Sequence, residues 1–118
     1  MSLTFLCAAA IAVDGDTLRC GGIGRVRLAR IDAPELHGCP PRRRCAPGDP
    51  RASRDNLARL IAAGPVRCRV VDANPFETGF QRTDRYGRPV ARCSVGGHDL
   101  GDAQLRGGHA VRWPAQAV

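Results

Sequence analysis

VDGDTLRCGGIGRVRLARIDAPE, residues 13–35, is the stretch of the chain that decides the fold. It contains two runs typical of short strands, about Thr17 to Cys20 and Arg25 to Ile31, with a turn of two glycines between them. The apolar run Leu3 to Val13 precedes them and predicts a first strand, which leads into the tight turn Asp14-Gly15-Asp16-Thr17. Three successive strands are therefore expected in the first third of the chain.

Two helices are predicted further along. Asp49-Pro50 is typical of a helix start, because Asp can cap free N–H groups and Pro suits the first helical turn. An apolar stripe follows, and Gly64 is expected to end this helix. Residues 99–106 predict a short second helix.

The remaining elements complete a small sheet. The alternating segments 66–70 and 90–95 predict the fourth and fifth strands, and a polar loop over 72–87 separates them. Residues 109–113 predict a last extended segment. Five short strands with a helix between the third and fourth predict a mainly β (α+β) fold, of which the five-stranded oligonucleotide-binding (OB) barrel is the commonest form. The 118 residues fit a single domain over 1–118.

The first residues are apolar, but we interpret them as a strand. They lack the basic segment that precedes the apolar part of a signal peptide, and they run straight into the turn at Asp14. No uncharged apolar run approaches the roughly 18 residues that a membrane helix needs. We therefore expect no membrane partner. We also expect the protein to be a monomer.

The charge of the chain points to a polyanionic partner. All 18 basic side chains are Arg, and they outweigh 11 acidic side chains to give a formal charge of +7. Because such a surplus on a small surface attracts polyanions, DNA or RNA is the predicted partner. A compositional bias toward Arg would produce the same surplus, so charge alone does not decide the function.

Six cysteines in a chain of this length favour an oxidising compartment, and we predict an exported protein, periplasmic or secreted. Cys39 and Cys45 enclose a polar loop with nothing apolar to bury them. A disulfide is therefore favoured there, with Arg42 to Arg44 held out toward solvent. The other four cysteines are interpreted as small core residues, although Cys7 and Cys20 flank the first hairpin and could pair.

Acidic side chains stand at two turning points of the chain. Asp14 and Asp16 lie on the first turn, where Asp commonly bonds to the backbone. The third strand ends in Asp32-Ala33-Pro34-Glu35. Strict alternation would put Arg27 and Asp32 on opposite faces of this strand. Both can serve one site only if the strand bulges or finishes near its end.

A third polar segment, residues 81–88, combines arginines with the only Tyr of the chain, which suits phosphate contact and base stacking. Together these clusters provide hard oxygen ligands for a cation such as Ca²⁺ (Asp16 and Asp32) and a carboxylate that can act as a base (Glu35). Their guanidinium groups match a phosphate. The set suits the attack of water on a phosphodiester.

Four segments resemble the signature motifs of the staphylococcal nuclease (thermonuclease) family, and they come in the family's order. They are VDGDT at 13–17, RLARIDAPE at 27–35, RTDRYGR at 82–88 and LRGGHA at 105–110. The resemblance spans about residues 8 to 112. It implies an OB barrel with helices and a Ca²⁺-dependent nuclease that cuts DNA and RNA, with the 5′ oxygen as leaving group.

The resemblance also implies a metal site. Asp16 and Asp32 match the carboxylates that bind calcium in the family, and Ala33 matches the position whose backbone carbonyl completes the ligand set. Asp14 matches an acid that lies close behind these ligands.

Roles in the reaction are implied in the same way. Glu35 matches the general base of the family, while Arg27 and Arg88 match its two phosphate-binding arginines. The candidate substrate contacts are Tyr86, Arg82 and Arg85, and Arg42 to Arg44 are further candidates.

The chain also departs from the family. The segments 36–48 and 72–80 flank the predicted site and could change substrate access. The chain ends soon after Trp113, so the C-terminal helix of longer members is expected to be missing. The alternative function is a noncatalytic module of the same fold that binds nucleic acid or serves as a scaffold. Some bacterial domains of the family carry polysaccharide-biosynthesis names, but no sugar-handling feature is visible here.

Overall fold

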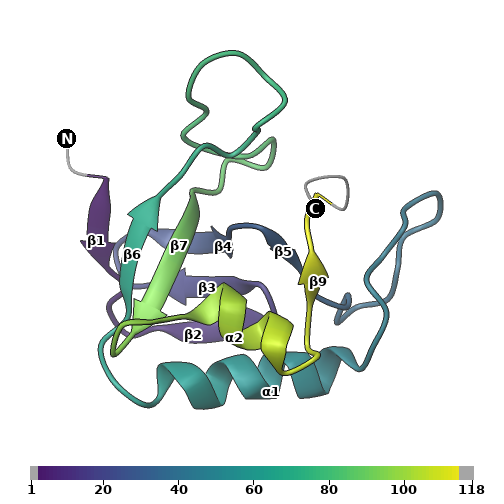
Figure 1. Cartoon of the computed structure of the whole chain (residues 1–118), viewed down its shortest axis with the longest axis horizontal. Helices are drawn as coiled ribbons and strands as arrows, with labels where there is room; N and C mark the ends of the chain where they lie inside the picture. The colour runs from purple at the N-terminus through teal and green to yellow at the C-terminus, as the bar shows by residue number, and fades with distance from the viewer. Residues whose placement is uncertain (1–2, 115–118) are drawn as a thin grey trace.

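The computed structural model describes residues 3–114, and within this range the protein is a mixed α+β fold, mainly sheet with two helices (Figure 1). The helices are α1 (Pro50–Ile61) and α2 (Leu100–Arg106). The strands are β1 (Thr4–Leu6), β2 (Ile11–Asp14), β3 (Thr17–Cys20), β4 (Gly24–Leu28), β5 (Ile31–Asp32), β6 (Arg67–Val70), β7 (Val90–Val95), β8 (His98–Asp99) and β9 (Val111–Arg112).

The main sheet is not closed into a barrel, so the predicted OB barrel is not confirmed. Its strand order is β1-β6-β7-β4-β3-β2, with β8 paired to β7, while β5 and β9 form a separate antiparallel pair. All neighbours in the main sheet are antiparallel except β4 and β7. The two outer strands, β1 and β2, are consecutive in the chain and are joined by residues 7–10.

A change of partner divides the predicted first strand into β1 and β2. The N–H of Cys7 donates to the carbonyl of Val66 at 2.9 Å, continuing the pairing with β6. The carbonyl of Ala8 instead accepts the N–H of Gly21 at 2.7 Å, beside β3. Ala9 turns the chain between these two partners with a φ of 48°. One apolar run in the sequence therefore contributes both edges of the sheet.

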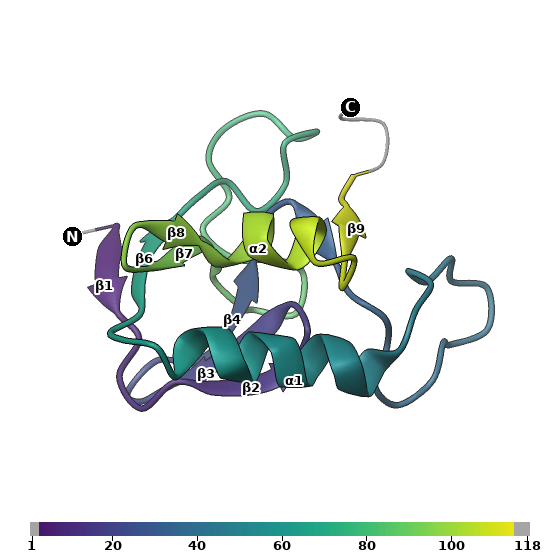
Figure 2. The same cartoon turned by 60° about the horizontal axis from the view of Figure 1, so that its bottom comes forward.

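Both predicted helices are confirmed. Asp49 caps α1 by accepting hydrogen bonds from the N–H groups of Arg51 and Ala52, and Pro50 occupies its first turn. Asp99 caps α2 by accepting the N–H of Asp102 at 2.8 Å. α1 packs against β2, α2 packs against β7, and the helices contact each other (Figure 2). Neither helix is long and apolar enough to cross a membrane, within the range that the structure describes.

β8 was not predicted. Gly96 and Gly97 both have positive φ, 58° and 80°, which permits a two-residue turn between β7 and β8. The question of a further helix after Trp113 extends into residues 115–118, which lie outside the described part of the chain.

Three disulfides staple the fold, and together they use all six cysteines. The predicted bridge Cys39–Cys45 is present, as is Cys7–Cys20. Cys68 and Cys93 face each other across β6 and β7 and are also bonded, a bridge that the sequence analysis did not predict. They are buried as expected, but they also link two strands. Three disulfides indicate an oxidising compartment.

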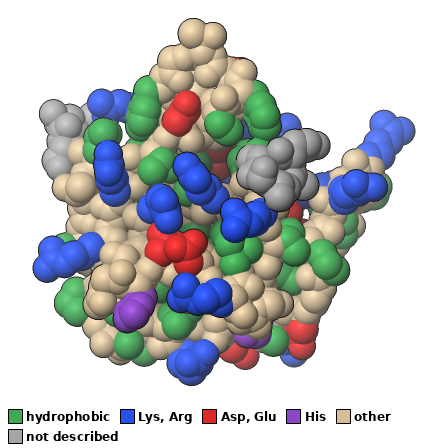
Figure 3. All heavy atoms as spheres, in the orientation of Figure 1, with side chains coloured by type: hydrophobic (Ala, Val, Ile, Leu, Met, Phe, Trp, Pro, Cys, Tyr) green, Lys and Arg blue, Asp and Glu red, His purple; other side chains and the backbone are tan. Residues whose placement is uncertain are grey.

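Basic side chains are spread over the surface. In the view of Figure 3 they stand in several separate places, and acidic side chains are also visible at several places among them. Arg92 contacts two such acids, with Nε 3.2 Å from Asp99 and Nη2 3.8 Å from Asp102. The positive charge visible on this face is therefore not concentrated in one patch.

Candidate functional site

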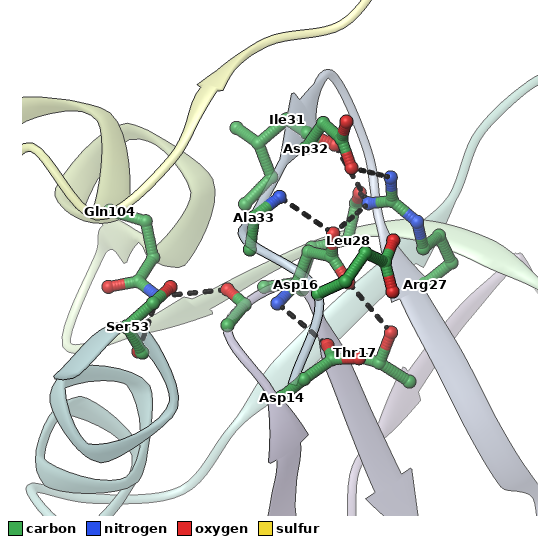
Figure 4. Close-up of polar contacts among 12 residues, drawn as sticks. Asp14, Asp16, Thr17, Arg27, Leu28, Ile31, Asp32, Ala33, Ser53 and Gln104 are labelled. Carbon is green, nitrogen blue, oxygen red and sulfur yellow. Dashed lines mark hydrogen bonds and ion pairs between the residues drawn. The ribbon is translucent and has the colours of Figure 1, made fainter. Parts of the chain in front are cut away.

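The turn between β2 and β3 holds the first two candidate carboxylates. The carboxylate of Asp14 accepts the backbone N–H of Asp16 at 3.1 Å, which closes the turn. Asp16 is 6% exposed, and its carboxylate accepts the Thr17 hydroxyl at 2.9 Å and the N–H of Ala33 at 2.8 Å. Because Ala33 directly follows β5, Asp16 links the turn to the end of the third predicted strand (Figure 4).

Arg27 lies between two carboxylates (Figure 4). Its Nη1 is 3.4 Å from Oδ2 of Asp16, and its Nη2 is 3.6 Å from Oδ1 of Asp32. Nη1 also donates to the carbonyls of Leu28 and Ile31, at 2.9 and 2.8 Å. These contacts hold the guanidinium of Arg27 in place, and only 15% of the Arg27 side chain is exposed.

A break in the strand brings Arg27 and Asp32 together. β4 ends at Leu28, Arg30 has a φ of 69°, and β5 begins at Ile31. Side chains other than Gly rarely adopt positive φ, so this residue marks a sharp change of direction. The sequence-based requirement that the strand bulge or finish near Ile31 is confirmed.

Glu35 and Asp32 share a second arginine. Nη1 of Arg43 lies 2.8 Å from Oε1 of Glu35, and its Nη2 lies 3.5 Å from Oδ1 of Asp32. Arg43 belongs to the Cys39–Cys45 loop, which was expected to hold Arg42 to Arg44 out toward solvent. For Arg43 this expectation is wrong, because its side chain turns back onto the carboxylates.

The second loop, residues 72–89, carries the other predicted site residues. Oδ2 of Asp84 lies 2.8 Å from Nε of Arg88, and its Oδ1 accepts the N–H groups of Tyr86 and Arg88 at 3.0 Å each. The guanidinium carbons of Arg85 and Arg88 lie 5.0 and 5.3 Å from the centre of the Tyr86 ring, within cation–π range. Asp84 thus holds the end of the loop in a conformation that places Arg85 and Arg88 beside the Tyr86 ring.

The two groups of predicted residues are joined through the backbone. The N–H of Arg27 donates to the carbonyl of Pro89 at 2.9 Å, and Arg27 pairs with Val90 where β4 meets β7. The base of the loop, with Arg88 beside Pro89, therefore lies next to the strand that carries Arg27. Between residues 3 and 114, no ion pair joins Arg88 or the exposed Arg82 to Asp16, Asp32 or Glu35.

The carboxyl groups of Asp14, Asp16 and Asp32 shift one another's pKa values. Burial raises the pKa of Asp14, and with the added effect of the neighbouring Asp16 carboxyl it reaches about 7. Burial also acts to raise the pKa of Asp16, but Arg27 and hydrogen bonds from its neighbours outweigh it and the pKa is lowered. The pKa of Asp32 is raised by burial, with Arg27 opposing and Asp16 adding to the rise. We call Asp14, Asp16, Arg27, Asp32 and Ala33 the inner cluster.

The inner cluster provides oxygen ligands that suit a hard cation. Asp16 and Asp32 are 6% and 7% exposed, and each lies within 4 Å of a guanidinium that compensates its charge. Paired carboxylate oxygens with a backbone carbonyl nearby are ligands that Ca²⁺ accepts, with water completing the shell. The described part of the chain gathers no group of three or more His, Cys, Asp or Glu side chains for a metal.

A buried amide supports the first turn from behind. Nε2 of Gln104, on α2, donates to the carbonyls of Gly15 and Ser53 at 2.8 and 2.9 Å, and Oε1 accepts Nδ2 of Asn56 at 2.6 Å. Gln104 is fully buried. A side chain at Gly15 would collide with Ser53 Oγ, so the turn fits against α1 only with glycine at this position.

Sequence reasoning missed the contact of Arg43 with the carboxylates, and it missed the structural roles of Asp84 and Gln104. For Asp84 there was a signal, since Asp followed three residues later by Gly is typical of a turn closed by the Asp side chain. Gln104 lies among apolar residues of a short helix, which is a weaker signal. The run of three arginines gives no sign of which one turns inward.

Comparisons with known proteins do not identify the chain. No model of a known protein family matches it, and a search of curated proteins found no match. The family resemblance therefore rests on the four quoted motifs.

Proposed function

We propose that this chain is a Ca²⁺-dependent phosphodiesterase that hydrolyses DNA and RNA, with the fold and site of the staphylococcal nuclease family. The observation that carries the proposal is the position of Arg27, whose guanidinium contacts both Asp16 and Asp32. Residues from two separate motifs converge there, and Glu35 is joined to the same group through Arg43. Such a set combines anionic oxygens for a cation with guanidinium groups for a phosphate.

The strand order supports the finer proposal of an OB-type barrel. β1 and β2, the free edges of the sheet, belong to one stretch of chain, and the Cys7–Cys20 disulfide ties that stretch to β3. We propose that β1 and β2 together correspond to the single bent first strand of such a barrel.

The proposed chemistry divides among few residues. Asp16, Asp32 and the carbonyl of Ala33 would hold Ca²⁺, which supplies positive charge to the scissile phosphate and its attacking water. Glu35 accepts a proton from that water as its oxygen attacks phosphorus. Arg27 and Arg88 donate hydrogen bonds to phosphate oxygens, where charge gathers in the transition state.

The 5′ oxygen then leaves and takes up a proton from solvent, and Glu35 releases its proton to solvent, so the products carry a 3′-phosphate and a 5′-hydroxyl. Tyr86, with Arg85 beside it and Arg82 on the same exposed loop, would contact the adjoining nucleotides by stacking and charge.

A cleavage assay tests this proposal. Purified protein is mixed with single-stranded DNA or RNA in Ca²⁺ and, in parallel, in a chelator of divalent cations. Cleavage that requires Ca²⁺ and yields 3′-phosphate ends is the expected result. Binding of the nucleic acid without cleavage in Ca²⁺ would overturn the proposal and favour the noncatalytic module instead.

A further inference from the structure

The loop between β5 and α1 places a basic side chain directly on the candidate site. The guanidinium of Arg43 contacts Glu35 at 2.8 Å and Asp32 at 3.5 Å. Both carboxylates have assigned roles in the proposed function, one as base and one as cation ligand. Arg43 itself has no role in that function.

The loop is shaped so that Arg43 turns inward. The Cys39–Cys45 disulfide closes it, and the N–H of Arg43 donates to the carbonyl of Pro40 at 3.3 Å. Arg42, one residue earlier, has a φ of 67°, which reverses the chain at the tip. The covalent bridge thus restricts where the Arg43 side chain can reach.

Two arginines contact Asp32, and they differ in how firmly they are held. Arg27 is 15% exposed in its side chain and also donates to backbone carbonyls at Leu28 and Ile31. The Arg43 side chain is 45% exposed, and its described contacts at the site are the two ion pairs. Of the two guanidinium groups, Arg43 is the one that can leave without breaking the fold.

We propose that Arg43, held in place by Glu35, is a built-in counter-ion that competes with a divalent cation for the carboxylate of Asp32. The inference rests on the proposed function, because it takes the cation site from there. A divalent cation and a guanidinium repel each other at this distance, so Arg43 must move aside when the cation binds. The concentration of Ca²⁺ that fills the site is therefore set partly by Arg43.

Calorimetric titration with Ca²⁺ alone, at fixed ionic strength and pH, tests the competition. Arg43→Ala is expected to bind Ca²⁺ about tenfold more tightly than the wild-type protein, since one competing charge is removed. Arg44→Ala is the matched control, because it removes the same charge from the same loop at an exposed position without an ion pair to the carboxylates. Its Ca²⁺ affinity should change less than threefold.

The disulfide provides a second arm. In the double variant Cys39→Ser, Cys45→Ser the loop is no longer closed, so the Ca²⁺ affinity should rise part of the way toward that of Arg43→Ala. Adding Arg43→Ala to this background should then have a smaller effect than it has in the wild-type protein. Equal effects in both backgrounds would show that the loop does not hold Arg43 in place, and would overturn that part of the proposal.

The outcomes separate this inference from the proposed function. If the wild-type protein binds Ca²⁺ and cleaves nucleic acid, but Arg43→Ala binds Ca²⁺ no more tightly than Arg44→Ala, only the competition is wrong. If Arg43→Ala binds more tightly and neither protein cleaves, the competition stands and the nuclease proposal fails. If neither protein binds Ca²⁺, both are overturned.

Discussion

The inner cluster and the two flanking loops are built in different ways. Asp16 and Arg27 in the inner cluster are held by neighbouring strands, and hydrogen bonds from backbone N–H groups and to backbone carbonyls fix their positions. Glu35 and Tyr86 stand on loops, where the contacts come from residues of the same segment, such as Arg43 and Asp84. Contacts with the sheet fix the positions of the inner-cluster side chains, whereas contacts within each loop fix the positions of Glu35 and Tyr86.

This contrast predicts which substitutions will lower stability and which will alter activity or affinity. Changes in or behind the inner cluster remove buried contacts and should lower the free energy of unfolding. Changes in the loops remove half-exposed or exposed groups and should alter activity or affinity with little effect on folding.

Replacing Glu35 by Gln should have the largest effect. The side chain is 27% exposed and contacts Arg43, so the folded structure should survive. Because Gln cannot accept the proton from the attacking water, turnover should fall by roughly two to four orders of magnitude. Initial rates of nucleic-acid cleavage in Ca²⁺ measure this change.

The only other glutamate of the chain provides the control. Glu77 is exposed on the 72–89 loop, so Glu77→Gln makes the same chemical change away from the proposed reacting atoms. It should retain wild-type turnover. A Glu35→Gln variant that is as fast as this control would remove Glu35 from the mechanism.

Replacing Gln104 by Leu should mainly lower stability. The change leaves the carbonyls of Gly15 and Ser53 without their buried donor, which costs about 3 kcal/mol in the free energy of unfolding. Urea unfolding followed by circular dichroism measures this loss. Gln81→Leu is the control, because its amide donates only within an exposed loop, and it should change stability by less than about 0.5 kcal/mol. Equal losses in the two variants would contradict the supporting role of Gln104.

The raised pKa of Asp14 predicts a pH dependence of stability in protein kept free of metal by a chelator. Since its pKa is about 7 in the folded protein, against 3.8 for an unperturbed Asp, the folded state holds the proton more tightly. The stability that this proton provides is complete below about pH 4 and is lost as the pH rises toward 7 and beyond.

Asp14→Asn should remove this loss, which is on the order of 2 kcal/mol between pH 5 and 8. Urea unfolding at both pH values measures the slope for the variant and the wild-type protein. Part of the wild-type slope should remain in the variant, because the pKa of Asp32 is raised as well. Identical slopes in the two proteins would show that Asp14 does not titrate as described.

Replacing Tyr86 by Ala should have the smallest effect. The side chain is 66% exposed, so folding should not change. Loss of one stacked base would weaken binding of a short oligonucleotide by about 1 kcal/mol, or roughly fivefold. Tyr86→Phe keeps the ring and should bind almost as well as the wild-type protein. If Tyr86→Ala binds equally well, stacking on this ring does not occur.

Elements whose signals are local were predicted from the sequence. Both helices begin at capping Asp residues that the sequence displays, and β3 runs over the predicted Thr17–Cys20. The juxtaposition of Arg27 and Asp32 was foreseen as a condition on the strand, and the positive φ of Arg30 satisfies it. Local chemistry was enough in these cases.

Features that depend on distant partners were not predicted. The division of the first strand follows from the chain leaving β6 for β3, which the apolar run alone does not encode. The Cys68–Cys93 bridge depends on the register of β6 against β7. The inward turn of Arg43 depends on a loop whose sequence makes all three arginines equivalent.

The position of β1 has a consequence for the order of folding. Thr4 pairs with Arg69, more than half the chain away, whereas β2, β3 and β4 pair in sequence. During synthesis β2, β3 and β4 can pair with one another early. β1 can pair only after β6 has been made, and closing so long a loop is itself slow. β1 thus precedes β2, β3 and β4 in the chain but joins the sheet after they can pair.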